Sequence, residues 1–466
     1  MPGLICSSCS AQDLTDSIGT GIIMFTFAAD DFAFRQEYFG GLLIRKSNNE
    51  IFEISKWDYI FLSLVREGVW PDQAESLMLG NFGVHFQPDL EAYEQSGFIV
   101  DQSTHGAPLP SVPLGDIDVS RLWLDLPPGY LCAPAEVSIY PTLRCQLSCD
   151  FCFAAEPMSQ GSKRSEVSAA TWLLTLESLA AAGTYSLSVL GGEPMQYGEI
   201  VPLLDGLNGL FPKMGLTSNG QSWSKELEEA VISCGNLVPC FSLQSLDDFN
   251  VRYMGRNFRI KRTTSLISRL LAGGRKSRIN AVYSGQSSAQ LRDLADFCDK
   301  SECEALSIAY RFDLVHHDSF REFRNVAESL REYIDQRGYC FTFRPEGCLT
   351  YTAYPEISEI KDLTAYQKLY FGCDAGKTRM EIHPSGDAYA CAVLTAPETR
   401  LGNVFESGWS DVWNGSKVAA HLRTAMTKAD KCHGCGLLEA CNGGCAAVVL
   451  HATGELIGEA DPRCLL

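Results

Sequence analysis

Three cysteines in the middle of the sequence have the type and spacing needed to bind a metal cluster. Cys145, Cys149 and Cys152 form the pattern CxxxCxxC within the segment RCQLSCDFC. Iron–sulfur clusters usually take four cysteine ligands, and no fourth cysteine lies close by in the sequence. One iron would stay open to another ligand, and an open metal position is reactive, as in catalytic zinc sites. Three buried cysteines or a zinc knuckle are the alternatives.

A second set of seven cysteines lies in the last part of the chain. It consists of Cys373, Cys391, Cys432, Cys435, Cys441, Cys445 and Cys464. Zinc ribbons would use CxxC pairs such as Cys432 and Cys435 equally well. The remaining pair near the start, Cys6 and Cys9, stands alone and is interpreted as surface thiols.

Composition narrows the class of protein. The 466 residues carry a net charge of −19, which argues against a nucleic-acid binder because such a protein needs a basic surface. The sequence contains neither a secretory signal nor an apolar run long enough to span a membrane, so we expect a cytoplasmic protein without a membrane partner. Cytoplasmic thiols stay reduced, and the 19 cysteines therefore indicate metal ligands.

Strands and helices alternate through the middle of the chain, which predicts a parallel sheet, either doubly wound or a partial barrel. The expected helices span 168–182, 223–233, 262–272 and 288–299. The expected strands are Val137–Tyr140, Ser186–Leu190, Met214–Thr217, Pro239–Leu243, Ile279–Tyr283 and Leu306–Tyr310. In either arrangement ligands gather at the carboxyl ends of the strands, where the first cysteine set lies.

The first hundred residues predict a separate small module. Two short strands, Gly41–Arg45 and Ile51–Ser55, are joined by a polar turn and followed by helical patterns at 57–66, 71–79 and 88–97, as in a winged helix. The Pro-rich stretch Thr104–Pro113 is typical of a linker. We expect a module at 1–105, a linker at 106–130, an α/β region at 131–340 and a Cys-rich region at 341–466.

The first cysteine motif resembles the signature of the radical S-adenosylmethionine (SAM) superfamily, and neighbouring motifs agree. The resemblance implies a partial (β/α)6 TIM-type barrel and a [4Fe–4S] cluster whose open iron binds SAM. Electron transfer to SAM then yields a 5'-deoxyadenosyl radical that abstracts a substrate hydrogen. The implied SAM contacts are Gly191, Gly192, Glu193 and Pro194 of the GGEP motif, Asn219, Ser242, Gln244 and Arg256. The family's usual Asp-Gly is altered around Gln244, which weakens that assignment.

The second cysteine set resembles the SPASM domain, an extension that binds auxiliary [4Fe–4S] clusters. The resemblance implies three clusters in all. Cys373, Cys391 and Cys445 would bind the first auxiliary cluster, with Cys348 as the candidate fourth ligand and Cys340 as its substitute. An open position for substrate on this cluster is the alternative. The second auxiliary cluster would be bound by Cys432, Cys435, Cys441 and Cys464.

The order of strands and helices in the first module resembles the PqqD-like element of peptide maturases, which binds the leader of a ribosomally synthesised precursor peptide by strand addition. The resemblance implies a peptide maturase that receives electrons from a flavodoxin or ferredoxin and installs a thioether or carbon–carbon crosslink. Epimerisation and backbone excision remain alternatives. A sulfatase-maturase activity is disfavoured because Ala392 follows Cys391, where those enzymes have an aspartate. Two alternative functions outside enzymology are a metal-binding adaptor and a DNA-binding regulator.

Overall fold

The computed structural model describes residues 25–48, 50–101, 117–154, 166–311, 313, 316–346 and 363–465. Within these ranges one sheet of ten strands runs through most of the molecule, in the order β12-β11-β10-β9-β8-β7-β6-β13-β14-β15. The strands are β6 (Glu136–Ile139), β7 (Ser186–Val189), β8 (Lys213–Ser218), β9 (Leu237–Ser242), β10 (Arg278–Tyr283), β11 (Ala305–Tyr310), β12 (Thr342–Glu346), β13 (Arg379–Ile382), β14 (Asp387–Tyr389) and β15 (Arg400–Asn403). Strands β6 to β12 pair in parallel, which confirms the parallel sheet expected from the sequence.

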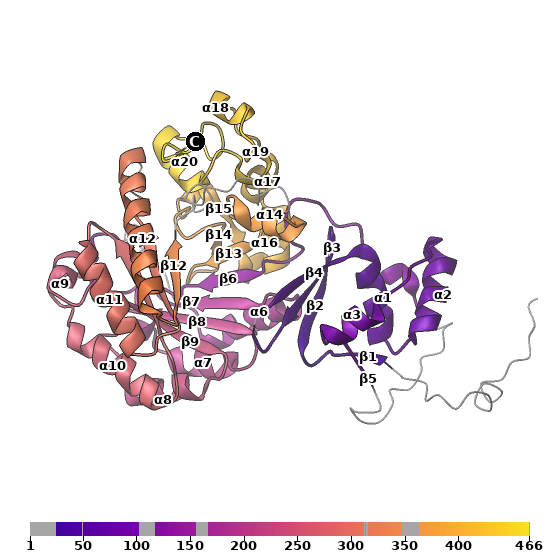
Figure 1. The fold of residues 1–466 in the computed structure, drawn as a ribbon, viewed down its shortest axis with the longest axis horizontal. Coiled ribbons are helices and arrows are strands. Elements are labelled where there is room, and N and C mark those ends of the chain that lie inside the picture. Colours follow the sequence, from indigo (N-terminus) through magenta and orange to yellow (C-terminus); the bar gives the residue numbers. More distant parts are fainter. Residues whose placement is uncertain are drawn as a thin grey trace, which may run out of the picture.

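Helices cover one face of this sheet because its side chains alternate. On β8, Met214 and Leu216 are fully buried in the main core, while the intervening Gly215 is only partly buried. The covering helices follow their strands along the chain, as Figure 1 shows. They are α6 (Ala169–Ala181), α7 (Ile200–Leu207), α8 (Lys225–Ser233), α10 (Ile260–Ala272), α11 (Ser288–Lys300) and α12 (His317–Arg337).

The other face of the sheet curves around a polar interior. Burial lowers the pKa of the Lys213 ammonium, whose electrostatic neighbours Glu136, Arg278 and Arg344 lie on β6, β10 and β12. Strand β12, which carries Arg344, lies four strands from β8 in the sheet order, so its influence on Lys213 indicates a curled sheet. The fold is therefore a partial barrel, and the doubly wound alternative is excluded.

The barrel sheet continues past residue 340, where the sequence suggested that the Cys-rich region begins. Strand β12 pairs in parallel with β11, and Arg379–Ile382 of the Cys-rich region pairs in parallel with β6. The Cys-rich region is thus joined to the barrel through backbone hydrogen bonds. A short charged strand such as β12 gives little apolar signal, which is why sequence patterns missed it.

The first module contains three antiparallel strands and three helices. They are β2 (Phe32–Glu37), β3 (Gly40–Arg45), β4 (Ile51–Ser55), α1 (Lys56–Arg66), α2 (Pro71–Phe82) and α3 (Leu90–Gln95), with β1 (Phe25–Phe27) paired to β5 (Ile99–Asp101). Ser55 and Asp58 form a capping box that starts α1 directly after β4. The two predicted strands and all three helices are present, and β2 is an addition. The predicted linker segment Thr104–Pro113 lies outside the described residues.

The sheet of the first module is packed on both faces. Leu43 faces the module's own helices, whereas Leu42 and Ile44 are fully buried against Leu131 and Tyr185 of the barrel side. Figure 1 shows this sheet between the module's helices and the rest of the molecule. None of the described helices is both long and apolar enough to cross a membrane.

A buried ion pair fastens the module to the barrel. The guanidinium of Arg35 lies 2.7 Å from the Glu37 carboxylate, with side-chain exposures of 7% and 0%. Arg35 also donates to the carbonyl of Gly183 in the barrel, and Glu37 accepts from the backbone N–H of Cys132. The Arg35 and Glu37 charges are thus stabilised by each other and by backbone groups of the barrel side.

We expect Glu37→Ala to destabilise the protein by about 3–5 kcal/mol, because it leaves the buried Arg35 guanidinium without its counter-charge. Replacing both residues by methionine should restore most of the loss. Thermal and urea unfolding of the full chain would measure both variants against Glu67→Ala, which removes an exposed pair with Arg66. A loss from Glu37→Ala no larger than that from Glu67→Ala would contradict the assignment.

Candidate active site

The cysteine loop that follows β6 is fastened at three places. The Arg144 guanidinium donates two hydrogen bonds of 2.8 Å to the Glu166 carboxylate. The backbone N–H of Asp150 donates to the carbonyl of Tyr253, at 2.8 Å, and the Asp150 carboxylate pairs with Arg311 at the end of β11. The loop therefore has fixed contacts with α9 (Phe249–Met254) and with the carboxyl end of the sheet.

The three thiols of the loop lie close enough to affect one another. Burial raises the pKa of Cys145 to about 11 and that of Cys149 to about 12, and neighbouring cysteines of the motif add to both shifts. Metal binding must displace these protons. Within the described residues no three Cys, His, Asp or Glu side chains converge on one point as the ligands of a single ion do. A cubane cluster instead binds its thiolates at separate corners.

The two glycines of the GGEP motif pack directly against the cysteine loop. A Cβ atom on Gly191, where φ is +151°, would lie 2.6 Å from the carbonyl oxygen of Thr142. A Cβ atom on Gly192 would lie 2.4 Å from that of Arg144. The N–H groups of Gly192 and Glu193 donate to these same two carbonyl oxygens, at 3.0 and 2.8 Å. Any larger side chain would force the loop away from the sheet.

Glu193 connects the ends of two neighbouring strands. Its buried carboxylate accepts from the Ser218 hydroxyl at 2.6 Å and from the Asn219 backbone N–H at 2.8 Å. Burial nevertheless raises its pKa to about 7. The amide nitrogen of Asn219 lies 3.9 Å from the Cys145 sulfur, so the GGEP motif, the end of β8 and the cysteine loop meet at one place.

The other expected SAM contacts lie farther along the strand ends. Ser242 is half-buried at the end of β9, opposite Asn280 in register. The amide oxygen of Gln244 accepts from the backbone N–H of Val282 at 2.6 Å, so this side chain joins β9 to β10 beyond their last paired residues. The Arg256 side chain is exposed beside α9.

Two residues of this network were missed by sequence reasoning. Gln146, inside the CxxxCxxC motif, donates to the amide oxygen of Asn219 at 3.1 Å. Trp223 donates through its indole N–H to the Ser218 hydroxyl at 2.9 Å. Gln146 could have been proposed from the sequence because it is a polar residue inside the CxxxCxxC motif. Trp223 belongs to no motif, so no sequence pattern indicated its role.

The cysteines of the last region fall into two electrostatic groups. Cys445 raises the pKa of both Cys373 and Cys391, after burial as the main cause. Cys464 and Cys435 do the same for Cys432. These neighbours agree with the division into two auxiliary sites that the SPASM resemblance implies. Cys348 lies outside the described residues, and Cys340 is exposed, with its thiol 3.8 Å from the Gly338 carbonyl oxygen.

A buried ion pair holds the two groups together. Asp461 accepts from the backbone N–H of Cys445 at 3.1 Å, and its own carbonyl accepts from the N–H of Cys464 at 3.0 Å. Arg463 pairs with Asp461 at 2.8 Å and lies over the rings of Tyr310 and Phe320 of the barrel. The Asp461–Arg463 pair thus positions one cysteine of each group relative to the barrel.

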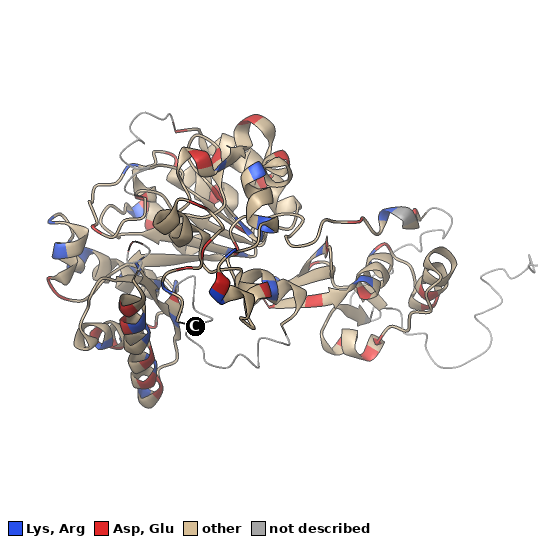
Figure 2. Cartoon of the chain, turned by 90° about the horizontal axis from the view of Figure 1, so that it is seen from above, with Lys and Arg blue, Asp and Glu red and all other residues tan. Residues whose placement is uncertain are grey.

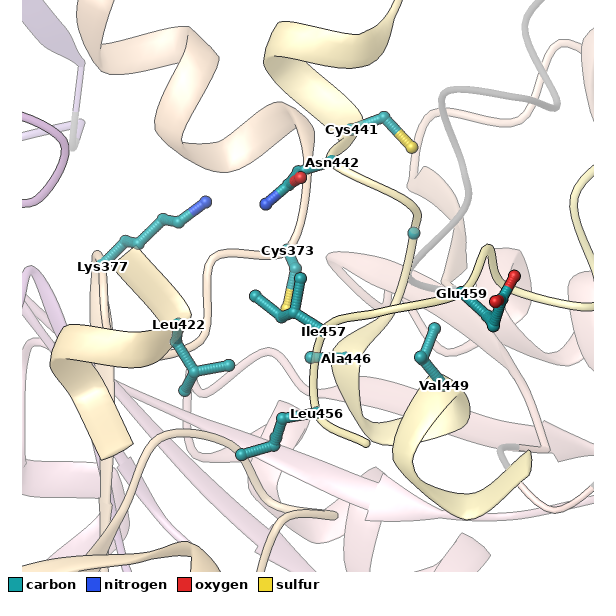
Figure 3. A pocket seen from close by; sticks show the side chains of 11 residues that line it. Cys373, Lys377, Leu422, Cys441, Asn442, Ala446, Val449, Leu456, Ile457 and Glu459 are labelled. Atoms are coloured by element: carbon teal, nitrogen blue, oxygen red, sulfur yellow. The ribbon is translucent and has the colours of Figure 1, made fainter. Parts of the chain in front are cut away.

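A small pocket, partly open to solvent, lies beside the first group. The Cys373 sulfur points into it, while the Cys441 sulfur points away, as Figure 3 shows. Leu422, Leu456 and Ile457 supply apolar walls.

Comparisons with known proteins match these features. The family model of the Radical SAM superfamily matches residues 139–298, and that of SPASM, an iron–sulfur cluster-binding domain, matches residues 373–436. The mycofactocin maturase MftC of Mycolicibacterium smegmatis is 24% identical over 70% of this chain and 81% of its own. The PqqA peptide cyclase of Gluconobacter oxydans is 23% identical over 70% and 88%.

Solved structures extend the similarity to nearly the whole chain. Streptococcus suis SuiB bound to S-adenosylmethionine is 31% identical, covers 95% of this chain and 100% of its own, and superposes with a TM-score of 0.78. SuiB bound to its precursor peptide SuiA is 30% identical with a TM-score of 0.77. The chain therefore belongs to the radical SAM superfamily of enzymes and carries a SPASM iron–sulfur domain.

Proposed function

We propose that this enzyme is a maturase that installs an intrapeptide crosslink, thioether or carbon–carbon, in a ribosomally synthesised precursor peptide. The observation that carries the proposal is the similarity to SuiB over 95% of the chain, because SuiB binds a precursor peptide. The curated relatives MftC and PqqA peptide cyclase are a maturase and a peptide cyclase. Fold alone would not support this conclusion, but the site agrees with it.

Membership of the family implies SAM and iron–sulfur clusters as cofactors. In our proposal there are three [4Fe–4S] clusters. Cys145, Cys149 and Cys152 hold the cluster that binds SAM, and the two cysteine groups of the SPASM domain hold the others. When bound there, the cluster and SAM would supply a 5'-deoxyadenosyl radical able to abstract a hydrogen atom from the peptide. The close contact of Gly191 and Gly192 with the cysteine loop supports the placement of this cluster.

Residues of the chain position SAM. The Glu193 carboxylate, fixed by Ser218 and Asn219, is proposed to accept a hydrogen bond from the SAM amino group. The Asn219 amide, 3.9 Å from the Cys145 sulfur, orients that thiolate. Helices close the outer face of the barrel, so SAM would bind at the inner face, beside the cysteine loop.

The first module is proposed to bind the leader of the precursor peptide. Its sheet has the order β2-β3-β4, so β4 is an edge strand within the described residues. Side chains of both outer strands contact neighbouring backbone: Gln36 of β2 bonds Leu124 in both directions, and Glu53 of β4 accepts from the N–H groups of Ala365 and Tyr366. An extended leader could add to β4 by main-chain hydrogen bonds. Because Leu42 and Ile44 of the neighbouring strand β3 pack against the barrel side, the bound leader would be held in a fixed orientation relative to the barrel.

Replacing Cys145, Cys149 and Cys152 together by alanine should lower the iron content of the anaerobically reconstituted protein from about twelve to about eight atoms per chain. SAM cleavage under dithionite should be lost. Cys234→Ala, at a buried cysteine in the barrel core, is the matched control and should change neither quantity. Zinc in place of iron, or cleavage that survives the triple replacement, would refute the assigned site.

Glu193→Gln should weaken SAM binding roughly tenfold, because a neutral amide accepts a hydrogen bond from the SAM amino group less strongly than a carboxylate does. Since burial raises the pKa of Glu193 to about 7, wild-type affinity should increase as the pH rises through that value and the carboxyl loses its proton. The variant should show no such increase. Equilibrium binding of SAM across this pH range measures both effects, and parallel pH profiles would contradict the assigned role.

The precursor peptide is to be sought among short open reading frames beside the gene, and its co-expression with the enzyme should give a product lighter by the mass of two hydrogen atoms for each crosslink. Tandem mass spectrometry should show fragmentation blocked between the joined residues. An unchanged mass with inverted residues would instead indicate an epimerase. Loss of a larger backbone fragment would indicate excision. Either result would overturn the crosslinking proposal.

A further inference from the structure

Positive charge is concentrated in one short part of an acidic chain. Of 38 Lys and Arg residues nine lie between 252 and 278, a stretch that contains none of the 57 Asp and Glu residues. The nine are Arg252, Arg256, Arg259, Lys261, Arg262, Arg269, Arg275, Lys276 and Arg278. A net charge of −19 makes such a concentration a candidate interaction surface.

The first five of these residues form an exposed group, here called the α9–α10 surface: Arg252, Arg256, Arg259, Lys261 and Arg262. Later members of the run have carboxylate partners, since Arg269 pairs with Glu228 and Arg278 with Glu304. In the surface group, hydrogen bonds of Arg259 and Arg262 go to backbone carbonyl oxygens. Within the described residues no carboxylate lies at ion-pair distance from any of the five.

The α9–α10 surface lies directly against the cysteine loop. The carbonyl oxygen of Met254, in α9, is 3.9 Å from the Cys149 sulfur. A Cβ atom on Gly255, where φ is +92°, would lie 3.3 Å from the Ser148 hydroxyl oxygen. One layer of backbone therefore separates the basic surface from a proposed cluster ligand. In Figure 2, blue ribbon segments that mark Lys and Arg lie at the left end of the molecule, the end where Figure 1 labels α9.

We propose that the α9–α10 surface is the docking site of an acidic one-electron carrier protein, of the flavodoxin or ferredoxin type. One electron passes from the reduced cofactor of the carrier to the cluster held by Cys145, Cys149 and Cys152. The carrier is oxidised by one electron and the cluster is reduced by one. This inference rests on the proposed function, which requires a reduced cluster before SAM is cleaved.

Charge complementarity favours an acidic carrier at this place. The acidic remainder of the chain repels such a protein, whereas the five unpaired cations attract it and orient it toward the cysteine loop. The rings of Phe249 and Tyr253 stack at 4.3 Å, and the Arg252 guanidinium lies 5.2 Å from the Tyr253 ring centre. These ring contacts restrict the motion of α9 and leave the positive charge of Arg252 without a carboxylate partner. A surface ordered in advance loses less conformational entropy when a partner docks.

The test uses the full reconstituted protein and compares a charge-reversed surface with a distant control. The variant Arg252→Glu/Lys261→Glu leaves Arg256, a proposed SAM contact, in place. The control Lys300→Glu/Lys417→Glu makes the same charge change at exposed residues of α11 and of α17 (Lys417–Thr424). The probes are a reduced flavodoxin and a plant-type ferredoxin. The measured quantities are the dissociation constant of each carrier and the rate of cluster reduction in rapid mixing.

We expect the surface variant to weaken carrier binding roughly tenfold or more at low ionic strength, with a smaller dependence on salt than wild type. The control should bind as wild type does. SAM cleavage driven by dithionite should be equal in all three proteins, which separates docking from chemistry. Loss of cleavage with dithionite in wild type would refute the proposed function, while the binding measurement would still report on docking.

Two results would overturn the docking proposal. One is equal carrier affinity in the surface variant and the control. The other is a loss of affinity for the precursor peptide with carrier binding unchanged, since the surface would then bind an acidic segment of the substrate.

Discussion

The close approach of Gly191 and Gly192 to the cysteine loop is the contact on which the candidate site depends. Two carbonyl oxygens of the loop, those of Thr142 and Arg144, occupy the space that side chains would otherwise fill, and the same oxygens accept hydrogen bonds from the following N–H groups. The loop is thereby placed on the carboxyl end of β7. Once it is there, Glu193 turns toward β8, and Asn219 comes within 3.9 Å of the Cys145 sulfur. Backbone contacts thus fix the thiols before any cofactor binds.

The two iron–sulfur regions are connected through the same sheet. Strand β6, which leads into the cysteine loop, pairs on one side with β7 and on the other with β13 of the SPASM region. The Cys373 and Cys391 positions flank the β13–β14 hairpin, so their distance from the cysteine loop is set by paired backbone rather than by a flexible linker. Such a framework suits a reaction in which an electron leaves the substrate radical after hydrogen transfer, because the acceptor must stay at a constant distance.

Much of this architecture was predictable because its signals are local. The strands of the barrel are short apolar runs, and α1 begins with a capping box readable as Ser55 and Asp58. Spacing alone identified the cysteine sets. Strand β2 was missed because Arg35 and Glu37 look like solvent-facing charges, although both are buried. Their burial depends on Gly183 and Cys132 of the barrel side, which no local pattern reports. Gln244 shows the same limit, since its amide oxygen bonds Val282, which is distant in sequence.

The net charge of this protein does not describe the local charge of its surface, because positive residues are concentrated in one part of the chain. The acidic total argued against a basic groove for nucleic acid, yet it concealed a stretch from Arg252 to Arg278 without a single carboxylate. Within that stretch the fold neutralises some cations through Glu228 and Glu304 and leaves the five beside the cysteine loop unpaired. Unpaired like charges repel one another at a cost to stability. Their retention next to the site of radical formation is understandable if a negatively charged partner must find that place on an otherwise repulsive surface.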